Sequence, residues 1–391
     1  CVLRFAAILL LLLTLGVANS PAAKAGSGGD PFAGWLTEGE AFPLGPHHRL
    51  QHHVNKSKTF YGTPALIDGL LRAATAVATQ VPDGQPLVVG NLSRKNGGDI
   101  GDSHTHNSGR DVDLVFFMTQ LDGTSVRVRN HHYDAQGLSR RLPKKYSFDL
   151  DRNWSVIEAM ASDQEMALQW VILEPHLELL LLKHAKEKGM SNAQLRRYAD
   201  MMTLPAYAGR HENHMHIRVQ CSIADWNERC QPTGPVWSWN TALEREVRRA
   251  SERVEADLTS PDRATRLEAL ETLWRKGLSP LLGQALPLLD DKDAKVRRRA
   301  RKMLVVLVSP DTAQAALDAA VSLEPVNRRL VTLWVLRRGG LAGLQVAREV
   351  TAGTHPTVSP RPRGSVLRDL QVAARRLVLR EEPIAELLGI N

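Results

Sequence analysis

The spacing of hydrophobic residues predicts alternating helices and strands in the first 240 residues. Apolar residues recur at helical spacing over Thr63–Thr79 and over Pro175–Lys188, and a third helix is expected to begin in Asn153–Met160. Short apolar or alternating runs predict four strands, at Leu87–Val89, Val112–Phe117, Trp170–Leu173 and Met215–Val219. This part of the chain is therefore expected to form a domain of mixed helices and strands.

From about residue 241 the pattern changes, because strand signals vanish and Ala, Leu and Arg dominate. Three positions of one segment recur 31 residues further on: Asp262, Ala269 and Leu273 match Asp293, Ala300 and Leu304. Weaker copies lie at 326–336 and 366–377, and 352–364 is expected to be a loop. Repeats of this size that consist of paired helices stack into solenoids. Residues 241–391 thus resemble HEAT-like α-helical repeats, with a generic helical bundle as the alternative.

The first 25 residues have the pattern of an export signal. Arg4 precedes an apolar run of 14 residues, Phe5–Ala18, and a possible Ala23-Lys24-Ala25 cleavage pattern follows. The run is short for a membrane span, although a retained anchor is the alternative. We therefore predict a signal peptide over 1–25 and a periplasmic or secreted protein. Residues 26–44 belong to a stretch rich in Gly, Pro and His, and they are expected to be a flexible, exposed arm.

Export also determines how the cysteines are interpreted. Removal of the signal leaves Cys221 and Cys230, with eight residues between them. In an oxidising compartment such a pair is expected to form a disulfide. The alternative is a pair of thiolate metal ligands, for which this spacing is long.

The net charge of +8 is concentrated in the C-terminal part of the chain. In residues 241–391, Lys and Arg outnumber Asp and Glu by seven, and a dense run consists of Arg297, Arg298, Arg299 and Arg301. Such asymmetry favours an anionic partner. We expect the repeats to bind an anionic envelope polymer or a protein, with a solvated helix face as the alternative. No nucleic-acid partner is expected.

Two histidine clusters about a hundred residues apart carry the candidate chemistry. His106 precedes a Ser-Gly turn that lets the chain fold back, so Asp113 in the next strand can converge on it. His214 and His216 share one face of a predicted strand, because residues i and i+2 point to the same side. Imidazole and carboxylate are ligands of catalytic zinc, which keeps one position open for water. The clusters together predict a metal site, although either alone is compatible with ordinary surface or core histidines.

Further motifs flank these clusters. They are Gly90-Asn91-Leu92-Ser93-Arg94, Gly97-Gly98-Asp99 and Tyr61-Gly62-Thr63-Pro64. Together with 106–113 and 211–216, they resemble the penicillin-insensitive murein endopeptidase family, over about residues 45–232. That family belongs to the wider group of lysostaphin-type, D-Ala-D-Ala-cleaving and hedgehog-like zinc folds. The resemblance implies an α+β zinc peptidase domain with a small antiparallel sheet over 45–236, followed by the all-α repeat domain over 241–391.

The resemblance also implies an activity and roles for residues. His106, Asp113 and His216 would hold one zinc ion per chain, and His214 and His211 would relay protons or stabilise an oxyanion. The substrate would be peptidoglycan, cut at peptide cross-links of the D-alanyl–meso-diaminopimelyl type. The alternatives are a D,D-carboxypeptidase or dipeptidase that acts on stem peptides, and a non-catalytic zinc-containing module that binds the cell wall.

The chain departs from the family pattern beside the first cluster. Family members usually carry a histidine three residues before the first ligand, where this chain has Ser103. His104 lies two residues before that ligand, so no role is assigned to it. Glu212 is a weak candidate for a general base, because on a strand it would face away from His211.

Overall fold

The computed structural model describes residues 26–101, 103–127, 129–140, 145–202, 209–358 and 365–390. The predicted signal segment and its cleavage pattern lie outside these residues. Within the described ranges, no helix combines the length and the apolar character that a membrane span needs.

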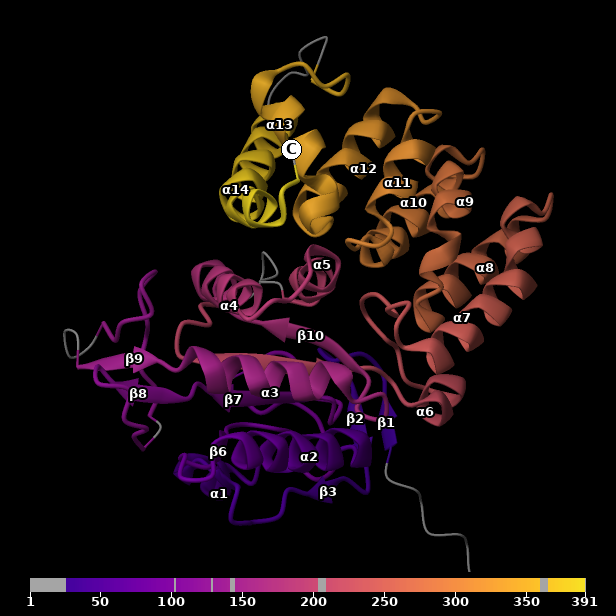
Figure 1. The fold of residues 1–391 in the computed structure, drawn as a ribbon. Coiled ribbons are helices and arrows are strands. Elements are labelled where there is room, and N and C mark those ends of the chain that lie inside the picture. The colour runs from indigo at the N-terminus through magenta and orange to yellow at the C-terminus, as the bar shows by residue number, and fades with distance from the viewer. Residues whose placement is uncertain are drawn as a thin grey trace, which may run out of the picture.

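A five-stranded sheet forms the centre of the N-terminal half (Figure 1). Its strands, in spatial order, are β10 (Leu168–Ile172), β11 (His214–Val219), β7 (Asp111–Val115), β6 (Leu87–Val89) and β4 (His48–Leu50). Neighbouring strands are antiparallel except β4 and β6, which run parallel. The sheet is therefore mixed, which corrects the expectation of an antiparallel sheet. The difference arises from β4, a strand too short to show an alternating pattern in the sequence.

Four helices pack with this sheet into one hydrophobic core. They are α2 (Pro64–Gln80), α3 (Leu150–Ser162), α4 (Pro175–Glu187) and α5 (Asn192–Met201). The sequence predicted the first three, and the structure confirms them. Helix α3 begins earlier than expected because the Asp149 side chain caps it by accepting a hydrogen bond from the backbone N–H of Arg152.

The segment expected to be an exposed arm is folded onto the domain. β1 (Gly26–Gly28) pairs with β2 (Trp35–Thr37), and β3 (Glu40–Ala41) pairs with β5 (Tyr61–Gly62). Within this segment Leu36 and Phe42 are only 2% and 3% exposed. The expectation of an exposed arm over 26–44 is therefore corrected. Strands of two or three residues give no periodicity, and their burial depends on partners far along the chain.

The remaining elements of this half are small. Helix α1 (His52–Ser57) precedes β5, and a separate two-stranded sheet pairs β8 (Met118–Gln120) with β9 (Tyr146–Phe148). Helix α6 (Ile223–Glu228) follows β11 and leads into the C-terminal half.

From residue 241 the described chain contains helices and no strand. The α-helices are α7 (Thr241–Val254), α8 (Arg263–Lys276), α9 (Leu282–Ala285), α10 (Ala294–Met303), α11 (Ala313–Ala320), α12 (Pro325–Arg338), α13 (Leu344–Ala352) and α14 (Ser365–Leu388). Short 3-10 helices separate some of them, at Glu255–Thr259, Ser279–Leu281, Leu286–Asp290, Leu304–Leu307 and Gly340–Gly343. Part of the expected loop, 353–358, is free of helix, and 359–364 lies outside the described residues.

The internal repeat has a local structural cause. Asp262 and Asp293 each stand immediately before a helix, at the N-termini of α8 and α10. The carboxylate of Asp262 accepts a hydrogen bond from the backbone N–H of Thr265, and that of Asp293 accepts one from Lys295. The repeated positions thus begin equivalent helices. The assignment to HEAT-like repeats stays a prediction.

The C-terminal helices α7–α14 form a helical array, and the elements β1–α6 form a sheet domain. The helical array contacts the sheet domain at both of its ends (Figure 1). At the start of the array, the indole N–H of Trp226 in α6 donates to the backbone carbonyl of Lys276 in α8, at 2.9 Å. At its end, α14 lies on α4 and α5, and the side chain of Asn192 donates to the carbonyl of Leu388 at 2.9 Å. Ile384 and Leu388 of α14 belong to the hydrophobic core of the sheet domain. The two halves are therefore packed together.

Candidate functional site

The central strands β7 and β11 place the candidate site on one face of the sheet. His216 lies opposite Asp113 in the antiparallel register, and Arg218 lies opposite Asp111. Because side chains alternate along a strand, these four share a face, and the apolar residues between them turn into the core. That core contains Val112, Leu114, Met215 and Ile217. The sequence predicted this alternation, but the structure buries the polar face as well, since His216 and Arg218 are 3% and 2% exposed.

Three of the predicted residues meet at one point. The Asp113 carboxylate oxygen Oδ1 lies 3.3 Å from Nε2 of His106 and 3.1 Å from Nδ1 of His216. One ligand atom from each of the three residues lies within 4.8 Å of the others. Nε2 of His106 is buried and lacks a hydrogen-bond partner among the described residues. Two imidazoles and one carboxylate match the donor set of a catalytic zinc site. The three residues could therefore hold a metal ion, which would lie between the His106 nitrogen and the Asp113 carboxylate and give that nitrogen a ligand bond in place of a poorly aligned contact.

The candidate ligands are held by neighbouring groups. Nδ1 of His106 lies 3.1 Å from the backbone carbonyl of Leu92, and Nε2 of His216 lies 2.7 Å from Oδ1 of Asp111. That Asp111 oxygen also accepts a hydrogen bond from Nε of Arg218 at 2.8 Å. Such outer contacts fix which imidazole nitrogen faces the ligand position. Each imidazole therefore presents its other nitrogen to Asp113.

The electrostatics of the group favour a positive charge at its centre. Burial acts to raise the pKa of Asp113, but the adjacent His106 and His214 outweigh it and hold this pKa well below its usual range. Burial acts to lower the pKa of His216, but hydrogen bonds to Asp111 and Asp113 raise it to about 9. The carboxylates thus stabilise a cation here, and metal binding would displace the imidazole protons.

His214 and His211 lie beside this group. Nε2 of His214 is 3.6 Å from Oδ1 of Asp113, and the His211 ring centre is 4.9 Å from that of His214 and 6.0 Å from that of His216. Burial is the main cause that lowers the pKa of both, to about 4 for His211. Burial therefore favours the uncharged form of both imidazoles.

A cavity of about 1020 Å³ opens beside the three candidate ligands. Asp113 and His216 line it, as do His211 and His214. Ser103, His104 and Thr105 form another part of its wall. The structure thus brings His104 to the cavity, although not into the group that could hold a metal.

Glu212 does not join the site. Its carboxylate lies 3.3 Å from Nδ1 of His132 and 3.4 Å from the Arg140 guanidinium, and its side chain is only 9% exposed. These contacts engage it in an ion pair, which counts against a role as general base.

Sequence reasoning missed Asp111 and Arg218. The alternation of side chains along β7 and β11 could have identified both residues. Asp111 lies two residues before Asp113 and Arg218 two residues after His216, so each shares a face with a candidate ligand.

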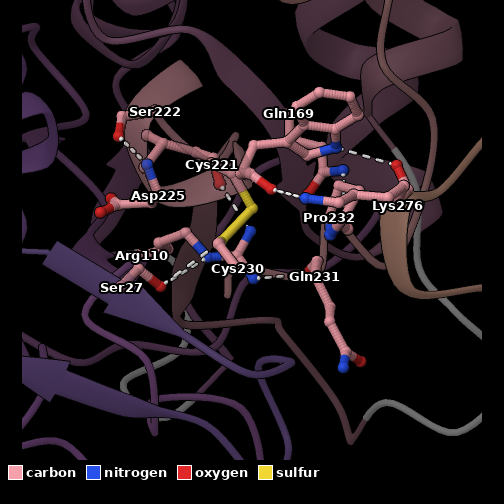
Figure 2. Close-up of a disulfide and its surroundings, with 12 residues drawn as sticks. Ser27, Arg110, Gln169, Cys221, Ser222, Asp225, Cys230, Gln231, Pro232 and Lys276 are labelled. Atoms are coloured by element: carbon pink, nitrogen blue, oxygen red, sulfur yellow. Dashed lines mark hydrogen bonds between the residues drawn. A yellow bond between two sulfur atoms is a disulfide. The ribbon is translucent and has the colours of Figure 1, made fainter. Parts of the chain in front are cut away.

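The predicted disulfide joins Cys221 and Cys230, with the Cα atoms 6.0 Å apart (Figure 2). The fully buried guanidinium of Arg110 lies beside it and donates to Ser27 in β1 at 3.2 Å and to the carbonyl of Gln231 at 2.9 Å. Arg110 directly precedes Asp111, so the disulfide segment and β1 are both fastened to the start of the strand that carries the site.

A His–Asp–His group that opens on a cavity could hold a metal ion and is consistent with a metallopeptidase. Residues 29–264 match the profile of the penicillin-insensitive murein endopeptidases. This match covers more than half of the chain, so the chain belongs to that family and is a peptidase of murein. No curated protein matches the chain. The family match begins inside the segment expected to be an arm and ends in α8, past the domain boundary expected at 236.

Proposed function

We propose that the protein is an exported, zinc-dependent endopeptidase that hydrolyses D-alanyl–meso-diaminopimelyl cross-links in peptidoglycan. Family membership supports the coarser class, a murein endopeptidase. The observation that supports zinc is the convergence of His106, Asp113 and His216 on one point. When bound there, a zinc ion supplies a Lewis acid for the scissile carbonyl and lowers the pKa of water.

The neighbouring histidines supply proton acceptors. Nδ1 of His214 lies 2.7 Å from Oδ1 of Asn213, and Nδ1 of His211 lies 2.7 Å from the carbonyl of Gly209. If each Nδ1 carries the proton in these contacts, Nε2 of each ring is left as an acceptor. We assign two roles to His214 and His211. They accept a proton during the hydrolysis and return it to the leaving amine. Alternatively, once an imidazole is protonated, it donates a hydrogen bond to the oxyanion.

Export is supported by two features. The N-terminal sequence has the order of a signal peptide, and the disulfide between Cys221 and Cys230 is of a kind that persists in oxidising compartments. We therefore assign the protein to the periplasm or the exterior. The test is to recover the protein from the cell envelope or the medium and to measure its mass. The mass should correspond to a chain that begins near residue 26. Recovery from the cytoplasm with residues 1–25 retained would contradict this assignment.

The activity is tested by digestion of purified cross-linked murein, with the products identified by mass. The wild-type chain should convert cross-linked dimers into monomers, and chelator should abolish this conversion. His216→Ala should remove both the activity and the bound zinc, because it deletes one of three ligands. The exposed His47→Ala is a matched control that should keep both.

The outcomes separate the alternatives. Dimers converted equally by the wild type with chelator and by His216→Ala would refute the zinc mechanism. Release of free D-alanine or of dipeptides, with the cross-links left intact, would indicate a carboxypeptidase or dipeptidase.

A further inference from the structure

A second cavity, of about 580 Å³, lies between the sheet domain and the helical array and adjoins the catalytic cavity. Phe32, Ile172, Arg218 and Arg338 line both cavities. Arg218 stands at the junction of the two cavities, since it lines both. Its Nε donates a hydrogen bond to Asp111, which in turn contacts His216. A ligand that occupies the second cavity can therefore continue directly to the candidate catalytic residues.

The helical array gives this cavity a positive wall. Arg337 and Arg338 at the end of α12 and Arg376 of α14 line it, and both helices lie above β10 in Figure 1. Among the described residues of the lining, Asp30 is the only acidic one. Its Oδ1 is engaged by the backbone N–H groups of Phe32 and Ala33, at 2.7 and 3.0 Å. The wall therefore carries more positive than negative charge and suits an anionic group.

The same cavity has apolar aromatic walls. Trp170 comes from β10, Trp274 from α8 and Trp334 from α12. Indole rings offer flat apolar faces that suit methyl groups and sugar rings, and arginines offer paired donors to carboxylates. A ligand that combines small apolar groups with carboxylates fits such a lining.

We propose that this cavity is a substrate subsite that binds the carboxylate-bearing stem peptide extending from the cross-link cut at the catalytic site. The proposal rests on the proposed function, since it concerns the same substrate. Arg337 and Arg376 bind carboxylates of the peptide, and Trp274 and Trp334 contact its apolar groups. All four residues lie beyond residue 264, where the family match ends, so the helical array adds this subsite to the family's peptidase region.

This location differs from the arginine run that the sequence singled out. Arg297 donates to backbone carbonyls of Asp291 and Lys292, Arg299 pairs with Glu271 at 2.9 Å, and Arg301 donates to Asn327. These three arginines are engaged within the array, and only Arg298 of the run is exposed without a contact of this kind among the described residues. The wall of the cavity is therefore the better candidate for contact with an anion.

The test measures binding separately from hydrolysis. The full chain is treated with chelator, and its affinity for a purified cross-linked muropeptide dimer is measured by titration calorimetry. In the double variant Arg337→Gln/Arg376→Gln, affinity should fall about tenfold, because hydrogen bonds to charged groups contribute roughly a factor of ten. The control is Arg375→Gln, an exposed neighbour on α14 outside the cavity lining, which should bind like the wild type.

A second probe tests the chemistry of the ligand. A dimer whose free carboxylates are converted to amides should bind the wild type about tenfold more weakly. The double variant should lose this discrimination. In the zinc-loaded chain, the same double variant should raise KM and leave kcat within about twofold.

The outcomes are distinguishable. Equal affinity of the double variant, the control and the wild type for the native dimer would overturn the subsite, whether or not the enzyme is active. Loss of affinity that is the same for native and amidated dimers would overturn the carboxylate contact. If the chelator-treated chain binds the dimers as expected but the zinc-loaded chain hydrolyses no murein, the results would support the subsite and refute the proposed function.

Discussion

A buried ionic cluster joins the helical array to the sheet domain and should make stability depend on pH. Arg380 of α14 faces two glutamates. Its Nη2 lies 3.4 Å from Oε2 of Glu178 in α4, and its Nε lies 3.4 Å from Oε1 of the adjacent Glu381. The side chains of Glu178 and Glu381 are 0% and 3% exposed. One cation thus faces two carboxyl groups that are removed from water.

The charges of this cluster cannot all be balanced. Burial raises the pKa of Glu178 to about 8, and the charge of Glu381 adds to this effect while Arg380 opposes it. Burial likewise raises the pKa of Glu381 and brings that of Asp200 in α5 to about 6. Burial acts to lower the pKa of Arg380, but the charge of Glu381 and the contact with Glu178 outweigh it and raise this pKa, so Arg380 stays charged. We therefore expect Glu178 to hold a proton at neutral pH in the folded protein.

The sign and size of the effect follow from this shift. The folded state keeps the Glu178 proton up to about pH 8, whereas an unfolded glutamate loses it around 4.5. The resulting stabilisation is fully present below the unfolded value and is lost as the pH rises through the folded value. Between pH 6 and pH 8, the contribution of Glu178 to the free energy of unfolding should fall by about 2 kcal/mol.

The assay is urea unfolding of the full chain at pH 6, 7 and 8. Glu178→Gln keeps the shape of the neutral form and removes its titration. The free energy of unfolding of this variant relative to the wild type should therefore increase by about 2 kcal/mol from pH 6 to pH 8. Glu187→Gln, an exposed change on the same helix, should follow the wild type. Parallel pH profiles of wild type and Glu178→Gln would refute the reasoning, because the carboxyl would then be charged throughout.

Three further changes probe the site and the two cores. Asp111→Asn should weaken zinc binding about 10- to 100-fold, because it removes the charged partner of His216. Competition with a chromophoric chelator measures the zinc affinity, and an unchanged affinity would contradict the role of Asp111. Replacing Cys221 and Cys230 together by Ser should lower the free energy of unfolding in urea by roughly 3 kcal/mol, given their sequence separation of 9, and adding reductant to the wild type should reproduce the loss. Leu270→Ala, in the fully buried face of α8, should cost about 2–5 kcal/mol in the same assay; a cost below about 1 kcal/mol would show that this core is not tightly packed.

The candidate ligands could be predicted because strand geometry is local. The alternation of His214, Met215 and His216 is visible in the sequence, and it fixes which side chains share a face. The Ser-Gly turn between His106 and Asp113 likewise suggests that the chain folds back. These features need no knowledge of distant partners, so the sequence and the structure agree on them.

The contacts of Asp111 with His216 and Arg218 could not be predicted in the same way. They depend on the register between β7 and β11, strands that lie about a hundred residues apart in the chain. The same limitation explains the segment expected to be an arm, whose short strands acquire order only from pairing. Glu178 is a further case, because its burial comes from α14, about two hundred residues later.

The packing of the two halves determines how the helical array can be studied. Ile384 and Leu388 complete the hydrophobic core of the sheet domain, and the disulfide segment packs in the core of the array. Deletion of 241–391 would therefore uncover apolar surface on α4 and α5 and disturb the sheet domain, whatever the array binds. A loss of murein binding after such a deletion would not distinguish a lost subsite from a damaged fold. Exposed point substitutions such as Arg337→Gln and Arg376→Gln leave both cores intact, so a change in affinity that they cause can be assigned to the cavity itself.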